Sequence, residues 1–346
     1  MLIRTDIDPN RRNVRPPFGE DLAEALARKV VGQPAAVTSI VPYLTMHKAG
    51  LAPEGRPVGV FLLLGPTGTG KTRTVEALAE LTHGSAKNMI KVDCGEFQME
   101  HEVAKLVGAP PGYLGHRETQ PMLTQQKING VASERSDLSL ILFDEIEKAA
   151  PSMTRMLLGI LDKAQLRLGD NNTVNFERTM IFLTSNLGAQ AMQKQMGTPF
   201  GFEAVVHETE EQRCTAKRLE QIGLAAVRRR FSPEFVNRID KVVTYKPLTN
   251  DDLAKILDHL LVEFQRLIDN RLGVRGFVLS LTPRGRKWLL KKGASQEYGA
   301  RELKRTIHRH VIQPLAASVA KGTVRPGTIV RMDPREDKLV ILPQAA

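Results

Sequence analysis

Two short segments carry residue types that suit phosphate chemistry. The first is GPTGTGKT at residues 65–72, which has the G-x-x-x-x-G-K-[ST] spacing and directly follows the apolar run VGVFLLLG. Between a strand and a helix, its glycines let successive backbone N–H groups curl around phosphate oxygens, while Lys71 supplies a positive charge and Thr72 a hydroxyl ligand for Mg²⁺. The residues predicted to bind a nucleotide are Gly65, Pro66, Thr67, Gly68, Thr69, Gly70, Lys71 and Thr72.

The second segment is LILFDE at residues 140–145. Its four apolar residues predict a strand that delivers Asp144 and Glu145 to its carboxyl end, where ligand sites of α/β sheets lie. Asp144 could hold the metal ion, and Glu145 could polarise the water that attacks the phosphate. Either carboxylate alone could equally cap a helix or form a salt bridge. Together with the phosphate loop, the pair favours nucleotide hydrolysis over passive binding.

The elements that must position these residues alternate between apolar runs and helical patterns. Fully apolar runs such as LILF are typical of strands that are buried on both faces, so we predict a mostly parallel sheet covered by helices, an α/β fold over residues 20–247. An extended lead-in over residues 1–19 precedes it, and the polar stretch 187–230 predicts an inserted loop followed by a helix. The runs predicted as strands are 58–65, 89–94, 138–145, 179–186 and 241–248.

The pattern of apolar residues changes after Pro247. Apolar residues from Leu253 to Ile268 recur at helical spacing, and Thr249 is a suitable N-cap for that helix. Further helical stretches alternate with three short strand candidates, GFVLSL, GTIVRM and KLVILP. Residues 248–346 are therefore predicted to form a smaller α+β domain.

Composition excludes several classes of protein. No apolar run reaches the roughly 20 residues that span a bilayer, and the first residues lack the features of a secretory signal, so we expect a cytoplasmic protein without a membrane partner. Cys94 and Cys214 have no metal-ligand spacing and are expected to be free thiols. Residues 248–346 carry 18 basic and 10 acidic groups. Such a basic face can bind nucleic acid, but we favour a solvated or subunit-contacting surface because no nucleic-acid-binding signature accompanies it.

Seven segments, in order, resemble the AAA+ ATPases, and within them the Clp-type unfoldases. The resemblance covers about residues 20 to 340 and is to the second ATPase ring and C-terminal small domain of ClpB-like and ClpC-like chains. It implies a P-loop NTPase fold with helices on both faces of the sheet, followed by the small domain. The segments are VVGQPAAV, GPTGTGKT, GAPPGYLG, LILFDEIEKA, TSNLG, FSPEFVNRID and YGARELKR.

The resemblance implies roles for residues near the nucleotide. Val30 and Val31 correspond to the segment that packs on adenine, although ordinary core packing would explain them equally well. Asn186, at the end of a predicted strand, corresponds to the sensor that helps to orient the hydrolytic water; otherwise it is a turn-forming Asn.

Two arginines also receive roles from the resemblance. Arg238 corresponds to the finger that reaches a neighbouring subunit's γ phosphate, which requires an oligomer, and its alternative is a surface salt bridge with Asp240. Arg301 corresponds to the second sensor, by which the small domain grips the nucleotide. Its alternative is one more charge on a basic helix.

The resemblance also places an aromatic residue in the channel of a ring. Tyr113 lies in a glycine-flanked loop and could grip an extended polypeptide through apolar area alone, although the same ring could stack on nucleic-acid bases or anchor the loop by packing. The residues after this loop, HRETQP, are more basic than is usual in the family. The pore-loop residues are Gly112, Tyr113, Leu114 and Gly115.

The resulting hypothesis is an ATP- and Mg²⁺-dependent protein unfoldase or disaggregase chaperone that works as a hexamer on unfolded or aggregated proteins. One alternative is delivery of substrates to a barrel-shaped peptidase that docks on Phe200, Gly201 and Phe202; Ile222, Gly223 and Leu224 form a second, helical candidate that we expect to be structural. Another is a nucleic-acid remodelling AAA+ ATPase, which we favour less. The sequence shows no N-terminal substrate domain, first ATPase ring or coiled-coil middle domain, so it resembles one ring standing alone.

Overall fold

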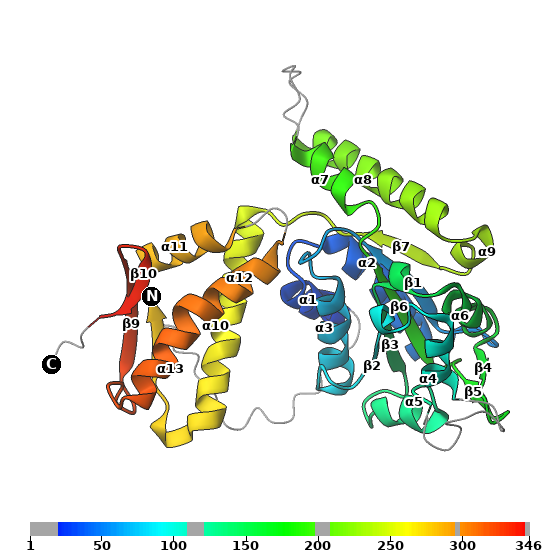
Figure 1. Ribbon diagram of the computed structural model, residues 1–346, viewed down its shortest axis with the longest axis horizontal. Coiled ribbons are helices and arrows are strands. Elements are labelled where there is room, and N and C mark those ends of the chain that lie inside the picture. Colours follow the sequence, from blue (N-terminus) through cyan, green and yellow to red (C-terminus); the bar gives the residue numbers. More distant parts are fainter. Residues whose placement is uncertain (1–19, 109–120, 198–207, 295–297, 343–346) are drawn as a thin grey trace. The chain divides into compact units, whose positions relative to one another are not determined.

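The computed structural model describes residues 20–108, 121–197, 208–294 and 298–342 (Figure 1). These residues form two compact units. The first, here called the sheet unit, contains the described residues up to 66 and from 70 to 246. The second, here called the C-terminal unit, contains those from 247 onward, and residues 67–69 are grouped with it.

A five-stranded parallel sheet forms the centre of the sheet unit. Its strand order is β2-β3-β6-β1-β7, and every neighbouring pair is parallel. The predicted α/β fold is therefore confirmed, and each predicted apolar run contains one of these strands. Their bounds are β1 (Gly59–Leu64), β2 (Ile90–Asp93), β3 (Ser139–Asp144), β6 (Thr179–Ser185) and β7 (Lys241–Thr244).

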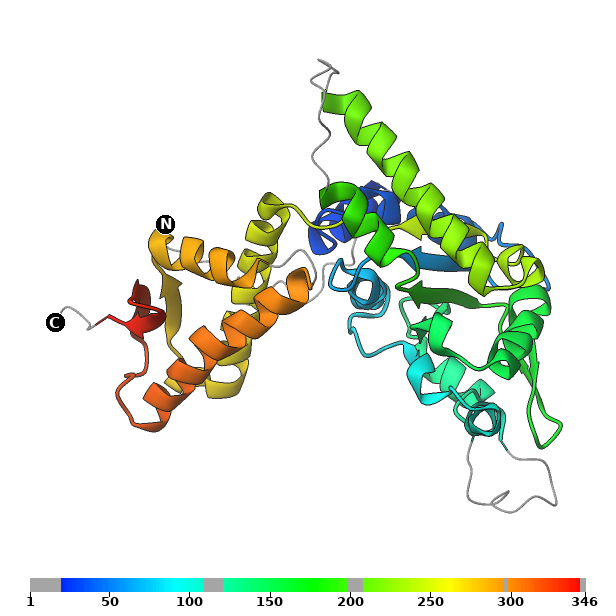
Figure 2. The ribbon, with the colours of Figure 1, turned by 45° about the horizontal axis from the view of Figure 1, so that its top comes forward.

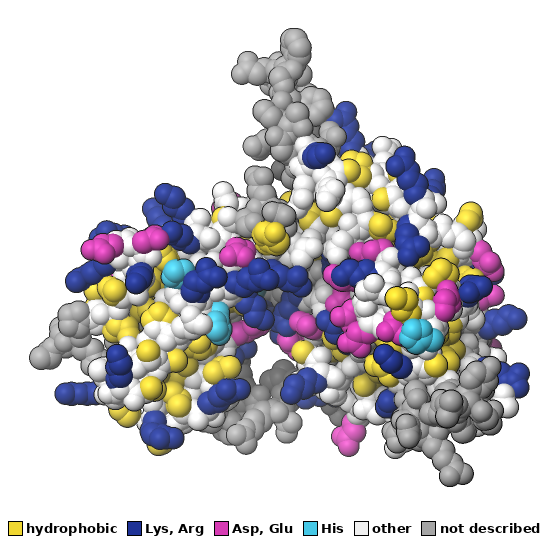
Figure 3. Space-filling model, viewed as in Figure 1, with side chains coloured by type: hydrophobic (Ala, Val, Ile, Leu, Met, Phe, Trp, Pro, Cys, Tyr) yellow, Lys and Arg dark blue, Asp and Glu magenta, His cyan; other side chains and the backbone are white. Residues whose placement is uncertain are grey.

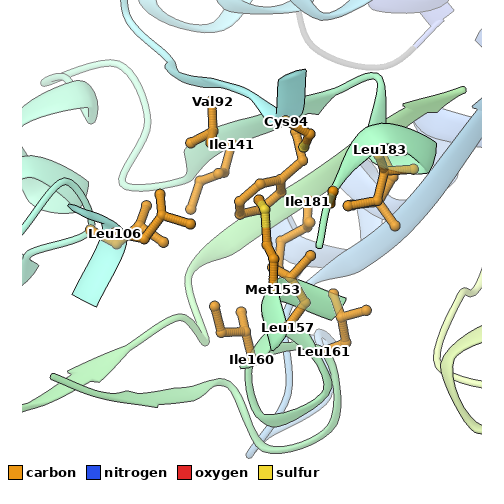
Figure 4. Packing of buried hydrophobic residues seen from close by; sticks show 14 of the residues in the cluster. Val92, Cys94, Leu106, Ile141, Met153, Leu157, Ile160, Leu161, Ile181 and Leu183 are labelled. Carbon is orange, nitrogen blue, oxygen red and sulfur yellow. The ribbon is translucent and has the colours of Figure 1, made fainter. Parts of the chain in front are cut away.

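Helices cover both faces of this sheet, because alternate strand residues point to opposite sides and both sides are apolar. One face packs against α1 (Glu20–Lys29), α2 (Pro34–Lys48) and α3 (Lys71–His83) through a core that includes Phe61 and Phe182. The other face packs against the short helices α4 (Ala104–Val107) and α5 (Gln125–Val131) and against α6 (Pro151–Lys163). Figure 4 shows Met153, Leu157 and Ile160 of α6 beside residues from the strands.

Several elements leave this core. After α6 comes a small antiparallel hairpin of β4 (Gln165–Arg167) and β5 (Thr173–Asn175), which is not among the runs predicted as strands. The stretch predicted as a loop and a helix contains two helices, α7 (Ala189–Gly197) and α8 (Glu208–Arg230), which lie side by side (Figure 2). The short helix α9 (Pro233–Val236) follows and leads into β7.

The C-terminal unit is built on α10 (Asn250–Leu272), whose first turn is closed by the predicted N-cap. Thr249 accepts a hydrogen bond from the Asp252 N–H, and the Asp252 carboxylate accepts one from the Thr249 N–H, which forms a capping box. A three-stranded sheet of order β10-β9-β8 completes the unit. Its other α-helices and strands are β8 (Val278–Leu281), α11 (Pro283–Gly293), α12 (Ala300–Ile307), α13 (Gln313–Ala320), β9 (Ile329–Arg335) and β10 (Lys338–Ile341).

Basic side chains are spread over the visible face of the C-terminal unit (Figure 3). On α12, Lys304 and Arg305 are exposed. Over the described ranges, no helix is both long enough and apolar enough to cross a membrane.

Candidate active site

The phosphate loop leaves β1 at Gly65 and enters α3 at Lys71. Gly65 has φ of 144°, and a Cβ placed on it would lie only 2.6 Å from the carbonyl oxygen of Tyr245. Gly70 is the N-cap of α3 and has φ of 104°. Side chains other than glycine are strained in both conformations, so the spacing of glycines in the loop follows from its path between strand and helix.

Lys71 is held inside the loop. Its side chain is largely buried, with a residue exposure of 8%. The Nζ donates hydrogen bonds to the carbonyl oxygens of Gly65 at 2.6 Å and Pro66 at 2.9 Å and to Oδ1 of Asn186 at 2.8 Å. The lysine therefore links the phosphate loop to the end of β6.

Asp144 lies at the end of β3, beside the first turn of α3. Its carboxylate accepts hydrogen bonds from Thr184 Oγ1 at 2.5 Å and from Thr72 Oγ1 at 3.4 Å, and Nζ of Lys91 lies 2.9 Å from it. Burial by itself would raise the pKa of Asp144, but the hydrogen bonds from Thr184 and Lys91 and the charges of Lys91 and Lys71 outweigh burial and lower the pKa. Asp144 is therefore a stable anion.

Glu145 follows in a left-handed backbone conformation, with φ of 58° and ψ of 50°. Its N–H donates to Thr184 Oγ1 at 2.9 Å, so the buried Thr184 hydroxyl contacts both acidic residues. The Glu145 carboxylate accepts a hydrogen bond from Asn186 Nδ2 at 3.3 Å and forms an ion pair with Lys148. That hydrogen-bonded pair raises the pKa of Lys148.

The segment proposed to pack on adenine lies at the start of α2. Val30 is buried in the core on the α1–α3 face, and Val31 is half-buried. Two residues further on, the buried Gln33 side chain donates to the Lys246 carbonyl at 2.8 Å and accepts from the Lys246 N–H at 3.0 Å. The structure places this segment against the end of the β7 segment, and the contact of Val30 and Val31 with a base stays a prediction.

Arg238 has a different ion-pair partner from the one expected. The alternative salt bridge with Asp240 is wrong: Asp240 pairs with Arg56 at 2.5 Å and accepts the Val60 N–H at 2.8 Å. Arg238 instead pairs with Asp162 near the end of α6 at 2.8 Å. The chain direction explains the difference, because Asp240 turns toward the start of β1 just before β7 begins.

Arg238 and the phosphate loop lie near opposite ends of strand β1. The Asp240 N–H donates to the Val60 carbonyl near the start of β1, whereas the loop follows the end of β1 at Leu64. Arg238 is therefore separated from Lys71 and Glu145 by the length of the strand.

Arg301 and two of the predicted segments are described separately from this cluster. Arg301 is exposed on the first turn of α12, in the C-terminal unit. Residues 112–115, with Tyr113, and the segment 200–202 lie outside the described residues. The helical candidate around Gly223 lies inside α8, where a Cβ on Gly223 would come within 2.8 Å of Met192 Cε, so this segment is packed against α7.

Sequence reasoning missed several residues that contact the predicted ones. Thr184 lies near the end of β6, two positions before Asn186. Lys91 lies on β2, whose register with β3 pairs Asp93 with Asp144. The polar Thr184 at the end of an apolar run, and the Lys91 between two apolar residues, were the available signals. Neither could be interpreted without the order of the strands.

Comparisons with known proteins agree with this geometry. The family model described as AAA domain (Cdc48 subfamily) matches residues 56–242, and the C-terminal D2-small domain of ClpB protein matches residues 248–332. The chain is 38% identical over 323 residues to the chaperone protein ClpB of Aquifex aeolicus, covering 93% of this chain and 30% of that protein. It is 38% identical over 306 residues to ClpB of Rhodopseudomonas palustris, covering 88% and 32%. The chain thus spans about a third of the length of these curated relatives.

Solved structures of Hsp104 are also similar. A closed-state cryo-EM reconstruction of Hsp104 with ATPγS and FITC casein superposes with a TM-score of 0.76 at 28% identity, covering 93% of this chain and 51% of that one. The S. cerevisiae Hsp104–casein complex in its extended conformation gives a TM-score of 0.77 at 28% identity, covering 92% and 51%.

Proposed function

The chain belongs to the AAA domain family (Cdc48 subfamily), and from that premise we propose that it is an ATP hydrolase that unfolds or disaggregates other proteins. Membership of this family implies nucleotide binding. ATP as the nucleotide, Mg²⁺ as its metal, a hexameric ring and a polypeptide substrate are parts of the proposal. One observation carries hydrolysis: Lys71, Asn186 and Glu145 form a continuous hydrogen-bonded series beside Asp144.

The first step of the proposal is phosphate binding. Lys71 exchanges its bonds to the Gly65 and Pro66 carbonyls for bonds to the β and γ phosphates, and the backbone N–H groups of the loop complete the cradle. Because these carbonyls belong to the phosphate loop itself, the lysine already lies where the phosphates would bind.

Thr72 and Asp144 fit a magnesium ion. A hydroxyl and a carboxylate are the hard oxygen ligands that Mg²⁺ prefers, and the low pKa of Asp144 keeps its carboxylate charged. In the described ranges no three His, Cys, Asp or Glu residues gather to hold a metal, so phosphate and water oxygens would supply the remaining ligands. When bound, the ion neutralises charge on the phosphates.

Glu145 and Asn186 are the proposed hydrolytic pair. The Glu145 carboxylate accepts a proton from the attacking water, and Asn186 orients that carboxylate through the hydrogen bond at 3.3 Å. Since Asn186 also accepts a bond from Lys71, its position depends on the lysine that binds the phosphate.

We assign Arg238 to the site of another copy of the chain. Strands rise about 3.3 Å per residue, so the end of β1 lies roughly 13 Å from Val60, near which Arg238 is located. An arginine cannot cover that distance within its own chain, whereas a neighbouring copy in a ring could receive it at its γ phosphate. Such a finger accelerates hydrolysis by about 10³-fold or more. The half-exposed ion pair with Asp162 is weak enough to be exchanged.

The polypeptide substrate is proposed from the relatives. The ClpB proteins are named chaperones, and both Hsp104 structures contain casein. We assign Tyr113 to grip the chain by apolar contact, which suits substrates of many sequences, and Arg301 to bind nucleotide from the C-terminal unit.

The decisive test is steady-state ATP turnover by the purified chain with casein or single-stranded DNA added. We expect casein to stimulate turnover and DNA to have no effect. Glu145→Gln should bind ATP but lose nearly all hydrolysis, and Tyr113→Ala should keep basal turnover but lose its stimulation by casein. Stimulation by DNA alone, or normal turnover in Glu145→Gln, would refute the proposal.

The role of Arg238 is tested by mixing variants. Arg238→Ala alone should be nearly inactive, and mixtures with Glu145→Gln should regain part of the turnover, because some shared sites then receive an intact Glu145 from one copy and an intact Arg238 from the other. Failure to regain turnover at every mixing ratio would exclude a finger acting between copies.

A further inference from the structure

The backbone of Glu145 is strained and must be held by its surroundings. A non-glycine residue in the left-handed region costs on the order of 1 to 3 kcal/mol and persists only where neighbouring contacts fix it. Two of these contacts are hydrogen bonds of the Glu145 backbone. Its N–H donates to Thr184 Oγ1, and its carbonyl accepts from the Lys148 N–H at 2.9 Å. The turn that follows, η4 (Ile146–Lys148), is therefore part of what presents the carboxylate.

The end of this short 3-10 turn has carbonyl groups that the turn itself does not satisfy. The Ala150 N–H, which would otherwise continue the series to the Glu147 carbonyl, donates to Phe97 instead. Arg230, the last residue of α8, takes its place: Nε and one Nη donate to the Glu147 carbonyl at 3.1 and 2.8 Å, and that Nη also reaches the Ala149 carbonyl at 3.3 Å.

A side chain of the same turn also binds the backbone of Asn186. Oε1 of Glu147 accepts the backbone N–H of Asn186 at 3.0 Å, whereas Oε2 is buried without a hydrogen-bond partner in the described part of the chain. Burying a carboxylate oxygen without a hydrogen-bond partner is unfavourable. The Glu147 side chain would therefore leave this position unless the backbone of the turn were held in place. Arg230 supplies that restraint from outside the turn.

The Arg230 side chain is also oriented by an aromatic ring next to it. Its guanidinium lies over the ring of Phe231 at 5.8 Å from the ring centre, and Phe231 is buried and stacked on Phe235. A planar group that is held over an aromatic ring loses less freedom when it forms several hydrogen bonds. The side chain of Arg229, the exposed residue just before it, makes no hydrogen bond or ion pair with any described residue.

We infer that Arg230 is a positioning residue for hydrolysis, which connects the end of α8 to Glu145 through the η4 turn and to Asn186 through Glu147. The guanidinium acts through the backbone of that turn, at the Glu147 and Ala149 carbonyls. The inference rests on the proposed ATP hydrolysis and adds a restraint to it: any partner or movement that displaces the end of α8 changes the rate of the chemical step.

Kinetics of matched variants test this inference. Arg230→Ala should lower kcat about 10-fold, since small misplacements of catalytic groups are costly, and should leave KM for ATP close to that of the wild type. Arg230→Lys keeps the charge but not the planar fork of donors, so its kcat should lie between those of Arg230→Ala and the wild type. The kcat of Arg229→Ala should match that of the wild type. Equal kcat values for Arg230→Ala and Arg229→Ala would overturn the inference, as would a loss confined to KM or to the melting temperature.

Hydrogen exchange separates this inference from the proposed function. The Asn186 amide proton should exchange faster in Arg230→Ala than in Arg229→Ala, because its Glu147 acceptor is released. This comparison does not need turnover, so a wild-type chain that failed to hydrolyse ATP would refute the proposed function while the exchange rates still tested the restraint. Unchanged exchange at Asn186 would overturn the role of Arg230.

Discussion

Replacing Gly65 by alanine tests how the phosphate loop is fixed at its start. The new Cβ would lie 2.6 Å from the Tyr245 carbonyl oxygen and 2.9 Å from the Tyr245 Cβ. Tyr245 has little freedom to move away, because it is fully buried, its N–H donates to the Leu64 carbonyl at 2.6 Å and its hydroxyl donates to Thr74 at 2.7 Å. The substitution therefore forces a displacement of the loop, of β7 or of both.

The expected loss of stability has two parts. Holding alanine at φ of 144° costs on the order of 1 to 3 kcal/mol. Displacing well-packed neighbours to make room for the methyl group costs about another 1 to 3 kcal/mol. At roughly 2 to 4 °C per kcal/mol for a unit of this size, the melting temperature of the sheet unit should fall on the order of 10 °C.

Gly70→Ala is the matched control. Gly70 also has a positive φ, 104°, but a Cβ on it would meet no atom within 4 Å. Thermal unfolding followed by circular dichroism without nucleotide should therefore show a clearly smaller loss for Gly70→Ala, which retains only the conformational term. If Gly70→Ala destabilises the protein as much as Gly65→Ala does, the close approach of Tyr245 contributes nothing and the reasoning is refuted.

Three further changes have defined outcomes. Gln33→Met removes both hydrogen bonds to Lys246 and should lower the free energy of unfolding by about 1 to 3 kcal/mol in denaturant titrations; no change would mean that water replaces the amide. The folded-state pKa of Asp144 lies below the ordinary 3.8, so its carboxylate stabilises the fold above pH 3.8, and this stabilisation is lost as the pH falls through the folded-state pKa. Asp144→Asn should therefore reduce the dependence of the free energy of unfolding on pH in the acid range. An unchanged dependence would contradict this. Burial and nearby carboxylates raise the pKa of the Cys94 thiol, so iodoacetamide at pH 8 should modify Cys94 only after the protein unfolds, as followed by mass spectrometry. Rapid modification of the native protein would show that the surroundings of Cys94 open.

The sequence was sufficient for the sheet because its strands are buried on both faces. Runs such as LILF have no polar alternation, so their apolar character alone predicted a central parallel strand, and β3 and β6 lie in the interior of the sheet. The β4–β5 hairpin was not predicted because its strands have three residues each, with polar or charged side chains at alternate positions. Such short strands carry too little apolar pattern to distinguish them from a turn.

The site was predictable in its residue types and not in its contacts. The phosphate-loop spacing and the strand-end acids identified Lys71, Asp144 and Glu145. The parallel register then brings Thr184 and Lys91 to Asp144, and no local sequence pattern contains that register. The left-handed backbone of Glu145 was also hidden, because the sequence gives no sign that a glutamate occupies a conformation usually left to glycine.

Arg238 illustrates how chain direction decides a contact that proximity in sequence suggests wrongly. Asp240 is only two residues away, yet the turn before β7 directs it to Arg56 and the Val60 N–H, which anchors the amino end of the strand. Arg238 is left on the other side of that turn, half-exposed and paired with Asp162 on α6. Asp240 thus anchors the strand, while Arg238 keeps only a half-exposed ion pair near the amino end of β1. An arginine in that position is better placed to act on another copy of the chain than on its own phosphate loop.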